Sequence, residues 1–270
     1  MDAITIKNLN YAYPNGHYAL KDINLNIKKG ARFVILGSNG SGKSTLLHHL
    51  NGLILPQSGT IEVFNQHINK KNLKAIRKKV GVVFDTPDDQ LFATSVYDDI
   101  AFGPRNLGLS EPLVNEAVEK ALKAVDIVKL KNQSPYALSL GQKKKASIAG
   151  VLAMNPDILV FDEPFSGLDH GSIEYLLTIF NELSHKGCTL IITTHNVDLA
   201  YSWGNECVLL KDGEILEQGS MHLLEDSQLM TSSHLRTNIL ATLFEETPFN
   251  PRTIDDAKAL LKKYMYTERN

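Results

Sequence analysis

Gly37-Ser38-Asn39-Gly40-Ser41-Gly42-Lys43-Ser44-Thr45 is the stretch that decides the fold, because it fits the phosphate-loop pattern G-x-x-x-x-G-K-[ST]. The apolar run at 32–36 ahead of it predicts a buried strand, and residues 45–50 behind it predict a helix. In this order the glycines let backbone N–H groups turn toward phosphate oxygens, and the helix N-terminus adds its positive dipole end. Lys43 would then reach the β- and γ-phosphates, and the Ser44 hydroxyl would reach Mg²⁺. The sequence predicts a nucleoside triphosphate site rather than a chance glycine-rich turn.

The composition is that of an ordinary globular chain. Of its 270 residues, 43% are hydrophobic and 21% are charged, which is enough to bury a full core. A net charge of −2 provides no global field for nucleic acid or an anionic membrane, so we expect no direct nucleic-acid partner. No apolar stretch approaches the roughly 20 residues that span a bilayer, and the N-terminus does not read as a signal peptide. Any membrane role is therefore expected to come through a partner.

Periodicity along the chain predicts a fold of the α/β class. Alternating segments at 4–13 and 20–27, with a short strand at 60–64, indicate an N-terminal antiparallel β subdomain. Buried strands at 80–84, 158–161 and 189–193 belong to the phosphate-loop NTPase core, and Asp212-Gly213 predicts a hairpin after them.

Two helical parts complete this expectation. An inserted α-helical subdomain is predicted at about 87–155, with breaks at Gly103-Pro104 and Ser134-Pro135. The main domain is expected to cover 1–220, and 221–270 to form a small helical C-terminal extension. In that extension Thr253-Ile254-Asp255-Asp256 has the capping-box pattern. One apolar face is expected to contain Ile254, Ala257, Leu260, Leu261 and Tyr264. Whether this tail is a packed appendage or a dimer contact stays open.

Two adjacent carboxylates close the predicted strand at 158–161. Asp162 is placed where a phosphate-loop protein directs a carboxylate at the Mg²⁺ that it shares with Ser44. Glu163 could polarise the attacking water as general base, an effect of about 10² to 10⁴ in rate. His195 ends the next strand and could contact the γ-phosphate from the edge.

Leu138-Ser139-Leu140-Gly141-Gln142 lies 20 residues before Asp162 and resembles the L-S-G-G-Q signature of ABC ATPases. Further motifs match that family in order: the phosphate loop, the strand ending in Asp162 and Glu163, Ser166-Gly167-Leu168-Asp169 as the D-loop, and His195 as the switch histidine. Tyr13 stands where the family places an aromatic side chain that stacks on adenine. The resemblance covers roughly residues 3–220.

This resemblance implies a head-to-tail dimer in which each ATP lies between two subunits. Ser139, Gly141 and Gln142 of the signature would approach the ATP that is held by the phosphate loop of the other subunit. Binding would close the dimer, hydrolysis with Glu163 as base would reopen it, and the motion would pass to membrane partners. The second ATPase subunit is expected to be either an identical copy or a paired sister ATPase.

A narrower likeness surrounds Val82-Val83-Phe84-Asp85-Thr86-Pro87-Asp88-Asp89-Gln90-Leu91-Phe92, with Asp98-Asp99-Ile100-Ala101-Phe102-Gly103-Pro104 downstream. It is similar to the ATPase subunits of energy-coupling factor importers, including the cobalt and nickel group. Those ATPases work with a transmembrane coupling protein and a substrate-binding membrane protein, and they take up vitamins or transition-metal ions. The likeness implies a peripheral place at the cytoplasmic face of the cell membrane.

The sequence departs from the family pattern in three places. Asp85 replaces the glutamine that contacts Mg²⁺ and the attacking water, and its extra charge is expected to lower turnover without abolishing ATP binding. Whether Asp85 or Gln90 serves in that role stays open. Leu140 replaces the first glycine of the signature pair, and Lys145 replaces a usual arginine, which keeps the charge but loses the fork geometry.

Two other classes fit the sequence less well. A soluble ABC ATPase that clamps nucleic acid in repair or translation usually has two fused cassettes or long coiled-coil insertions, and neither pattern is present here. An unrelated phosphate-loop kinase would leave the signature and the D-loop without an explanation. Co-purification separates transport from clamping, since the first predicts membrane proteins and the second predicts nucleic acid.

Overall fold

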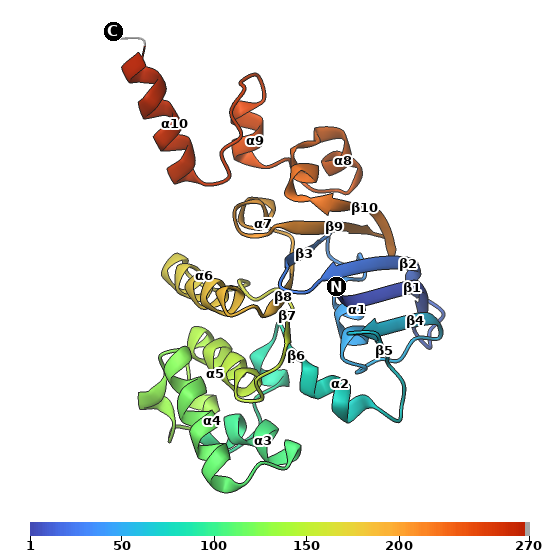
Figure 1. Ribbon diagram of the computed structural model, residues 1–270, viewed down its shortest axis with the longest axis vertical. Coiled ribbons are helices and arrows are strands. Elements are labelled where there is room, and N and C mark those ends of the chain that lie inside the picture. Colours follow the sequence, from blue (N-terminus) through green and yellow to red (C-terminus); the bar gives the residue numbers. More distant parts are fainter. Residues whose placement is uncertain (268–270) are drawn as a thin grey trace.

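The computed structural model describes residues 1–263 in full and the backbone of 264–267. A six-stranded sheet lies at its centre (Figure 1). Its strands, in spatial order, are β10 (Glu214–Ser220), β9 (Glu206–Lys211), β3 (Arg32–Leu36), β8 (Thr189–Thr194), β7 (Ile158–Phe161) and β6 (Val80–Val83). All neighbours pair in parallel except β10, which turns back on β9 through the predicted hairpin. The carboxyl ends of the parallel strands therefore meet at one edge, where ligands bind in such sheets.

A second, antiparallel sheet forms the N-terminal β subdomain, as the alternation predicts. Its order is β2 (Tyr18–Lys28), β1 (Asp2–Ala12), β4 (Ser58–Val63) and β5 (Gln66–His67). Helix α1 (Lys43–Leu50) follows the phosphate loop, and α2 (Leu73–Lys79) leads from this sheet into β6.

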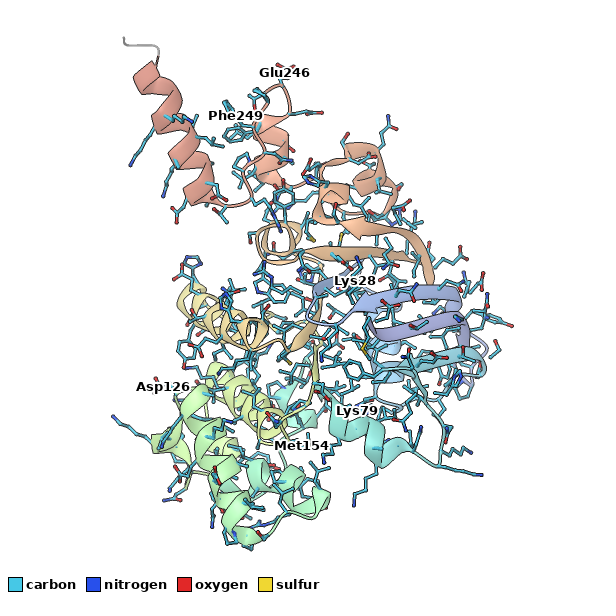
Figure 2. All side chains as sticks on the ribbon, in the orientation of Figure 1. Lys28, Lys79, Asp126, Met154, Glu246 and Phe249 are labelled. Atoms are coloured by element: carbon cyan, nitrogen blue, oxygen red, sulfur yellow. The ribbon has the colours of Figure 1, made fainter. Side chains whose placement is uncertain are left out.

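The central strands are apolar on both faces because both faces are covered. Phe33 and Ile35 of β3 point into a core shared with α1 and the antiparallel sheet. Their neighbours Val34 and Leu36 point into a second core with α6 (His170–His185) and α7 (Val197–Trp203). Side chains fill the layers on both sides of the sheet (Figure 2).

The helical subdomain is built from α3 (Val96–Leu107), α4 (Glu111–Ala124) and α5 (Leu140–Leu152), with three short 3₁₀ turns. Those turns are η1 (Pro87–Asp89), η2 (Val128–Leu130) and η3 (Pro135–Ala137). The expected break at Ser134-Pro135 is present, since η3 separates the helices. The expected break at Gly103-Pro104 is wrong, because α3 continues through Pro104 to a left-handed cap at Gly108. Pro104 is buried in the subdomain, and this packing outweighs the lost hydrogen bond.

The extension contains η4 (Met221–Glu225), α8 (Ser227–Ser232), α9 (Ile239–Phe244) and α10 (Ile254–Thr267). In Figure 1 α10 extends away from both sheets. The predicted capping box is present, since Thr253 Oγ1 accepts from the Asp256 amide at 3.1 Å and Asp256 accepts from the Thr253 amide at 3.0 Å. The predicted apolar face is only partly packed, because Ala257 is buried whereas Ile254 and Leu261 are exposed.

The side chain of Tyr264, the last member of the predicted apolar face, lies outside the described residues. None of the helices that they form is both long and apolar enough to cross a membrane.

Candidate nucleotide site

The phosphate loop turns sharply between β3 and α1, and three glycines make this turn possible. Gly40 and Gly42 have φ angles of 82° and 104°, which other residues rarely adopt. A Cβ atom on Gly42 would lie 2.6 Å from the Ala19 carbonyl oxygen, and one on Gly37 would lie 2.4 Å from that of Leu210. The loop therefore packs against neighbouring backbone where only glycine fits.

Lys43 is the first residue of α1 and its side chain is only 7% exposed. Its ammonium group donates to the carbonyl oxygens of Gly37 at 2.8 Å and Ser38 at 3.1 Å. It also lies 3.7 Å from Glu163 Oε1. The cation of the loop thus faces the carboxylate that follows β7.

A cleft of about 430 Å³ opens at this edge of the sheet. It is lined by Tyr13, His17, Ala19, Asn39, Gly40, Gly42, Lys43, Ser44, Thr45, Asp85, Asp162 and Glu163. Most of the predicted site residues are thus brought together. Gly37, Ser38 and Ser41 belong to the same loop but are not among the lining residues, and the Ser41 hydroxyl is buried without a partner among the described residues. His195 and the signature residues do not line the cleft.

Tyr13 stands at the mouth of the cleft, 37% exposed. Its hydroxyl lies 2.8 Å from Thr45 Oγ1, and its ring meets that of Tyr11 edge to face at 5.2 Å. These contacts fix a half-exposed aromatic face beside the loop. His17 lines the cleft next to Tyr13, because the Tyr13 amide donates to the His17 carbonyl oxygen in the turn between β1 and β2. The sequence analysis did not identify His17, and only its place in that turn could have suggested it.

One hydroxyl from β8 orients both carboxylates after β7. Thr193 Oγ1 donates to Asp162 Oδ1 at 2.6 Å and accepts from the Glu163 amide at 2.8 Å. Asp162 is buried, and Glu163 has a φ angle of 40°, a strained conformation for a residue with a side chain. Sequence reasoning missed Thr193, because its role depends on the pairing of β7 with β8.

His195 follows β8, and its Nδ1 lies 3.2 Å from Glu163 Oε1. Its side chain is 62% exposed, so the ring sits at the rim rather than inside the cleft. Glu163 Oε1 is therefore contacted by two groups, the Lys43 ammonium and the His195 ring.

Lys144 of helix α5 holds the strained segment from the other side. Its ammonium group donates to the carbonyl oxygens of Glu163 at 3.2 Å, Pro164 at 3.3 Å and Ser166 at 2.8 Å. It also lies 3.8 Å from Asp85 Oδ1. Burial lowers the pKa of Lys144, and the negative charges of Asp85 and Glu163 oppose that change. This buried lysine joins the helical subdomain to the segment that follows β7, and the sequence analysis did not single it out.

Asp85 and Gln90 are clearly separated in space. Asp85 lines the cleft, and burial raises its pKa. The positive charge of Lys144 lowers that pKa, whereas the negative charges of Asp162 and Glu163 raise it further. The Gln90 amide is instead occupied by backbone, since it accepts from the Phe84 amide at 3.2 Å and donates to the Ser147 carbonyl at 2.8 Å. Asp85, and not Gln90, therefore faces the site.

The signature begins α5 on a surface of its own. Ser139 is the N-cap, and it forms a capping box with Gln142: each side chain binds the other residue's backbone amide, at 3.4 and 3.0 Å. A Cβ atom on Gly141 would lie 3.6 Å from Ser172 Oγ, so the signature sits beside the start of α6, just after the D-loop. The S-x-x-Q spacing could have predicted this box. Lys145 lies with its ammonium 3.8 Å from the centre of the Tyr175 ring.

Comparisons with known proteins point to one family. A family model described as "ABC transporter" matches residues 20–166. The energy-coupling factor transporter ATP-binding protein EcfA of Carboxydothermus hydrogenoformans is 44% identical over 267 residues, which make up 98% of this chain and 99% of that protein. The solved structure of CbiO1 from Clostridium perfringens, described as part of the ABC transporter complex CbiONQ, is similar with a TM-score of 0.76 and 38% identity, covering 90% of this chain and 99% of CbiO1. The solved dimeric structure of the ATP-binding cassette MJ0796, bound to ADP and Pi, is similar with a TM-score of 0.75 and 29% identity. The match covers 81% of this chain and 98% of the MJ0796 chain.

Proposed function

Because the chain belongs to the ABC transporter family, as the ATP-hydrolysing subunit of an energy-coupling factor transporter, we propose that its turnover drives import of a transition-metal ion or a vitamin. The observation that carries the mechanism is the arrangement around Glu163. Its Oε1 lies 3.7 Å from the Lys43 ammonium and 3.2 Å from His195, at the edge of the cleft that the phosphate loop lines.

In this proposal the triphosphate lies along the phosphate loop. The amides of 37–45 and the Lys43 ammonium bind the β- and γ-phosphates, and the half-exposed ring of Tyr13 stacks on the adenine base. Such stacking contributes about 1–3 kcal/mol per base. The close backbone packing at Gly37 and Gly42 keeps the cradle free of side chains that would displace phosphate oxygens.

The residues present also fit Mg²⁺. This ion prefers oxygen ligands and is usually bound through one or two carboxylates plus phosphate oxygens. The Ser44 hydroxyl, Asp162 and Asp85 supply that set at one end of the cleft. When bound, the metal would neutralise charge that develops between the β- and γ-phosphates.

Glu163 is the proposed general base, and Thr193, Lys144 and His195 set its position. Thr193 and Lys144 hold its backbone on two sides, so the strained conformation aims the carboxylate at the cleft. His195 binds Glu163 Oε1 and would contact the γ-phosphate from the rim. Proton abstraction from water by a group held in this way supports hydrolysis.

The signature is proposed to act on the second subunit's ATP. Ser139, Gly141 and Gln142 do not line this chain's cleft, and Ser139 is exposed. The capping box leaves the N-terminus of α5 well formed, so its dipole can be directed at a phosphate from outside. Gln142 then supports the signature through the cap, besides any contact with nucleotide.

The helical subdomain offers a groove for a membrane partner. This hollow of about 300 Å³ includes Gln90, Phe92 and Phe102, and the two phenylalanines are 58% and 49% exposed. Their rings meet edge to face at 4.8 Å, which forms an apolar platform on the surface. Because Gln90 connects the groove to the strand end that leads into Asp85, we propose that the transmembrane coupling protein docks here. A substrate-binding membrane protein would complete the complex at the cytoplasmic face of the membrane.

Co-purification tests this function. The chain, isolated from membranes in detergent, is expected to bring along integral membrane proteins and to lose them after Phe92→Asp with Phe102→Asp. The pair Tyr18→Asp with Tyr136→Asp, two other exposed aromatic side chains, serves as a matched control and should retain them. Bound nucleic acid without membrane proteins would refute the transport role and support a clamp.

A further inference from the structure

Helix α7 begins two residues after His195, and the C-terminal extension holds both of its ends. The backbone between β8 and α7 consists of His195 and Asn196 alone. Asn196 caps α7 by accepting from the Leu199 amide at 3.1 Å, and its own amide donates to Thr194 Oγ1 at 3.0 Å. A shift of α7 therefore moves His195 directly.

The first hold is at the start of α7. Asp198 Oδ1 accepts from Asn238 Nδ2 and from the Ile239 amide, both at 2.9 Å, and the Arg236 guanidinium pairs with the other oxygen. All three donors belong to the segment that begins α9. Asn238 is 1% exposed and caps α9 by accepting from the Ala241 amide, so this anchor is itself fixed.

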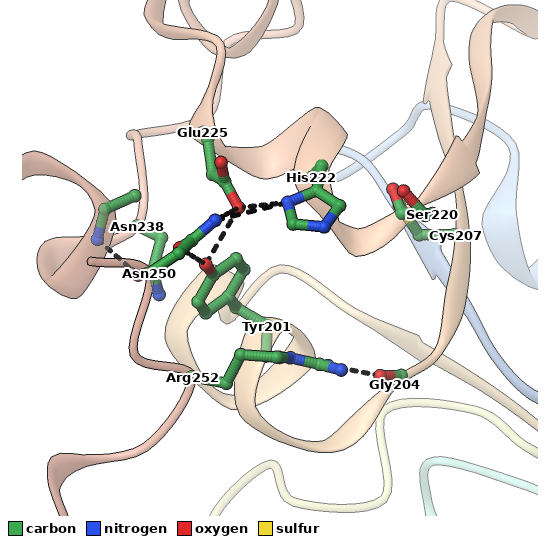
Figure 3. Close-up of polar contacts among 10 residues, drawn as sticks. Tyr201, Gly204, Cys207, Ser220, His222, Glu225, Asn238, Asn250 and Arg252 are labelled. Carbon is green, nitrogen blue, oxygen red and sulfur yellow. Dashed lines mark hydrogen bonds and ion pairs between the residues drawn. The ribbon is translucent and has the colours of Figure 1, made fainter. Parts of the chain in front are cut away.

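The second hold is at the end of α7. Arg252 Nε donates to the Tyr201 carbonyl oxygen at 3.0 Å, its Nη2 also reaches the Gly204 carbonyl oxygen, and its guanidinium lies 5.6 Å from the centre of the Tyr201 ring. The Tyr201 hydroxyl lies 2.8 Å from Glu225 Oε1 and 2.6 Å from Asn250 Oδ1 (Figure 3). Asn250 donates to Glu225 at 2.9 Å, which closes the network.

Between these holds α7 is a short, rigid element. It has seven residues, so it is about 10 Å long. Val197, Ala200, Tyr201 and Trp203 are buried in the core on one side of the central sheet, and the Tyr201 hydroxyl reaches the extension. The contacts that hold α7 involve four charged side chains, although the helix contains no residue of the proposed nucleotide site. These side chains are Asp198, Glu225, Arg236 and Arg252.

We propose that the extension is a working part of the ATPase, with Asp198, Arg236 and Arg252 as positioning residues that set where His195 lies relative to Glu163. This inference rests on the proposed role of His195. It gives the part of the extension from Glu225 to Arg252 a function within the subunit. Because misplacement of a catalytic group by 1 Å can cost about 10²-fold in rate, a loosened α7 should lower kcat about 10-fold.

The test uses the full-length chain and compares Arg236→Ala and Asp198→Ala with the wild type. We expect kcat to fall about 10-fold while the KM for ATP and the affinity for ATP stay within 2-fold. Arg236→Lys should recover part of the loss, and amide hydrogen exchange at 195–204 should speed up. Glu119→Gln, which breaks the distant 2.8 Å pair with Lys131, is the matched control and should change none of these.

A double-mutant cycle with His195→Ala decides whether the effect passes through His195. If it does, Arg236→Ala costs little further activity once His195 is absent. Equal losses in both backgrounds, or no loss from either substitution at Asp198 or Arg236, would overturn the inference. If His195→Ala alone leaves turnover unchanged, the proposed role of His195 fails instead. Because Arg236 is exposed, the variant Arg236→Ala should fold. The double-mutant cycle can therefore be measured with Arg236→Ala even if Asp198→Ala does not fold.

Discussion

Lys144→Met tests how the strained Glu163 segment is held. The substitution keeps an unbranched chain of similar length but removes the ammonium that binds three carbonyl oxygens and faces Asp85. Hydrogen bonds to a charged group contribute about 1.5–3 kcal/mol each, and breaking a buried charge pair costs about 3–5 kcal/mol. Asp85 is 49% exposed, so water screens that pair and its share falls to about 1 kcal/mol or less. The three bonds together amount to about 4.5–9 kcal/mol. Because the substitution also removes the desolvation penalty of the buried ammonium, which is on the order of several kcal/mol, we expect the free energy of unfolding to fall by about 3 kcal/mol.

Turnover should fall as well, by about 10-fold or more, because the Glu163 backbone can relax from its strained conformation. Urea unfolding followed by the fluorescence of Trp203, the single tryptophan and a buried one, measures the first effect, and steady-state ATP hydrolysis measures the second. Lys145→Met is the matched control on the same helix. It loses only the contact with the Tyr175 ring, which is worth about 0.5–1 kcal/mol. Equal unfolding midpoints and equal rates for the two variants would refute the reasoning.

Substitutions at three further positions probe the cleft and the extension. Tyr13→Ala should weaken ATP binding about 10-fold in equilibrium titration, whereas Tyr13→Phe should stay within about 2-fold because it keeps the ring and loses only the bond to Thr45. Asp85→Gln should raise kcat several-fold at saturating Mg²⁺; an unchanged rate would show that Asp85 does not slow the reaction. Glu225→Gln should destabilise the chain by about 1 kcal/mol at pH 7. Burial raises the pKa of Glu225, but hydrogen bonds from Asn250, Tyr201 and His222 outweigh it and leave that pKa below 4.5. The carboxylate thus stabilises the fold fully above the usual pKa of a glutamate and less as the pH falls through the lowered pKa, so the urea midpoints of variant and wild type should converge at acidic pH; a constant difference would contradict this.

Local patterns were sufficient for most of the fold. The phosphate loop, the individual strands and the hairpin at Asp212-Gly213 each depend on residues within one short segment, and the structure contains them. The prediction at Gly103-Pro104 was wrong because a proline normally ends a helix, and only tertiary packing shows that α3 passes through it.

Residues of the candidate site could be predicted where they belong to a sequence motif. They could not be predicted where their role depends on contacts between distant segments. Thr193 is one of several threonines in an apolar run, and its role appears only when β8 pairs with β7. Lys144 lies between two other lysines, so no sequence rule distinguishes the one that is buried. The holds at Asp198 and Arg252 join segments that are 40 to 50 residues apart, which no local pattern reports.

The central claim is that the cleft is half of a site that a second subunit completes. Glu163→Gln removes the proposed base and should keep ATP bound, so the variant is expected to accumulate as a dimer. Light scattering at saturating ATP should then give about twice the chain mass of 29.9 kDa, and adding Ser139→Arg should return the mass to that of the monomer. A Glu163→Gln variant that stays monomeric with ATP bound would contradict the shared site.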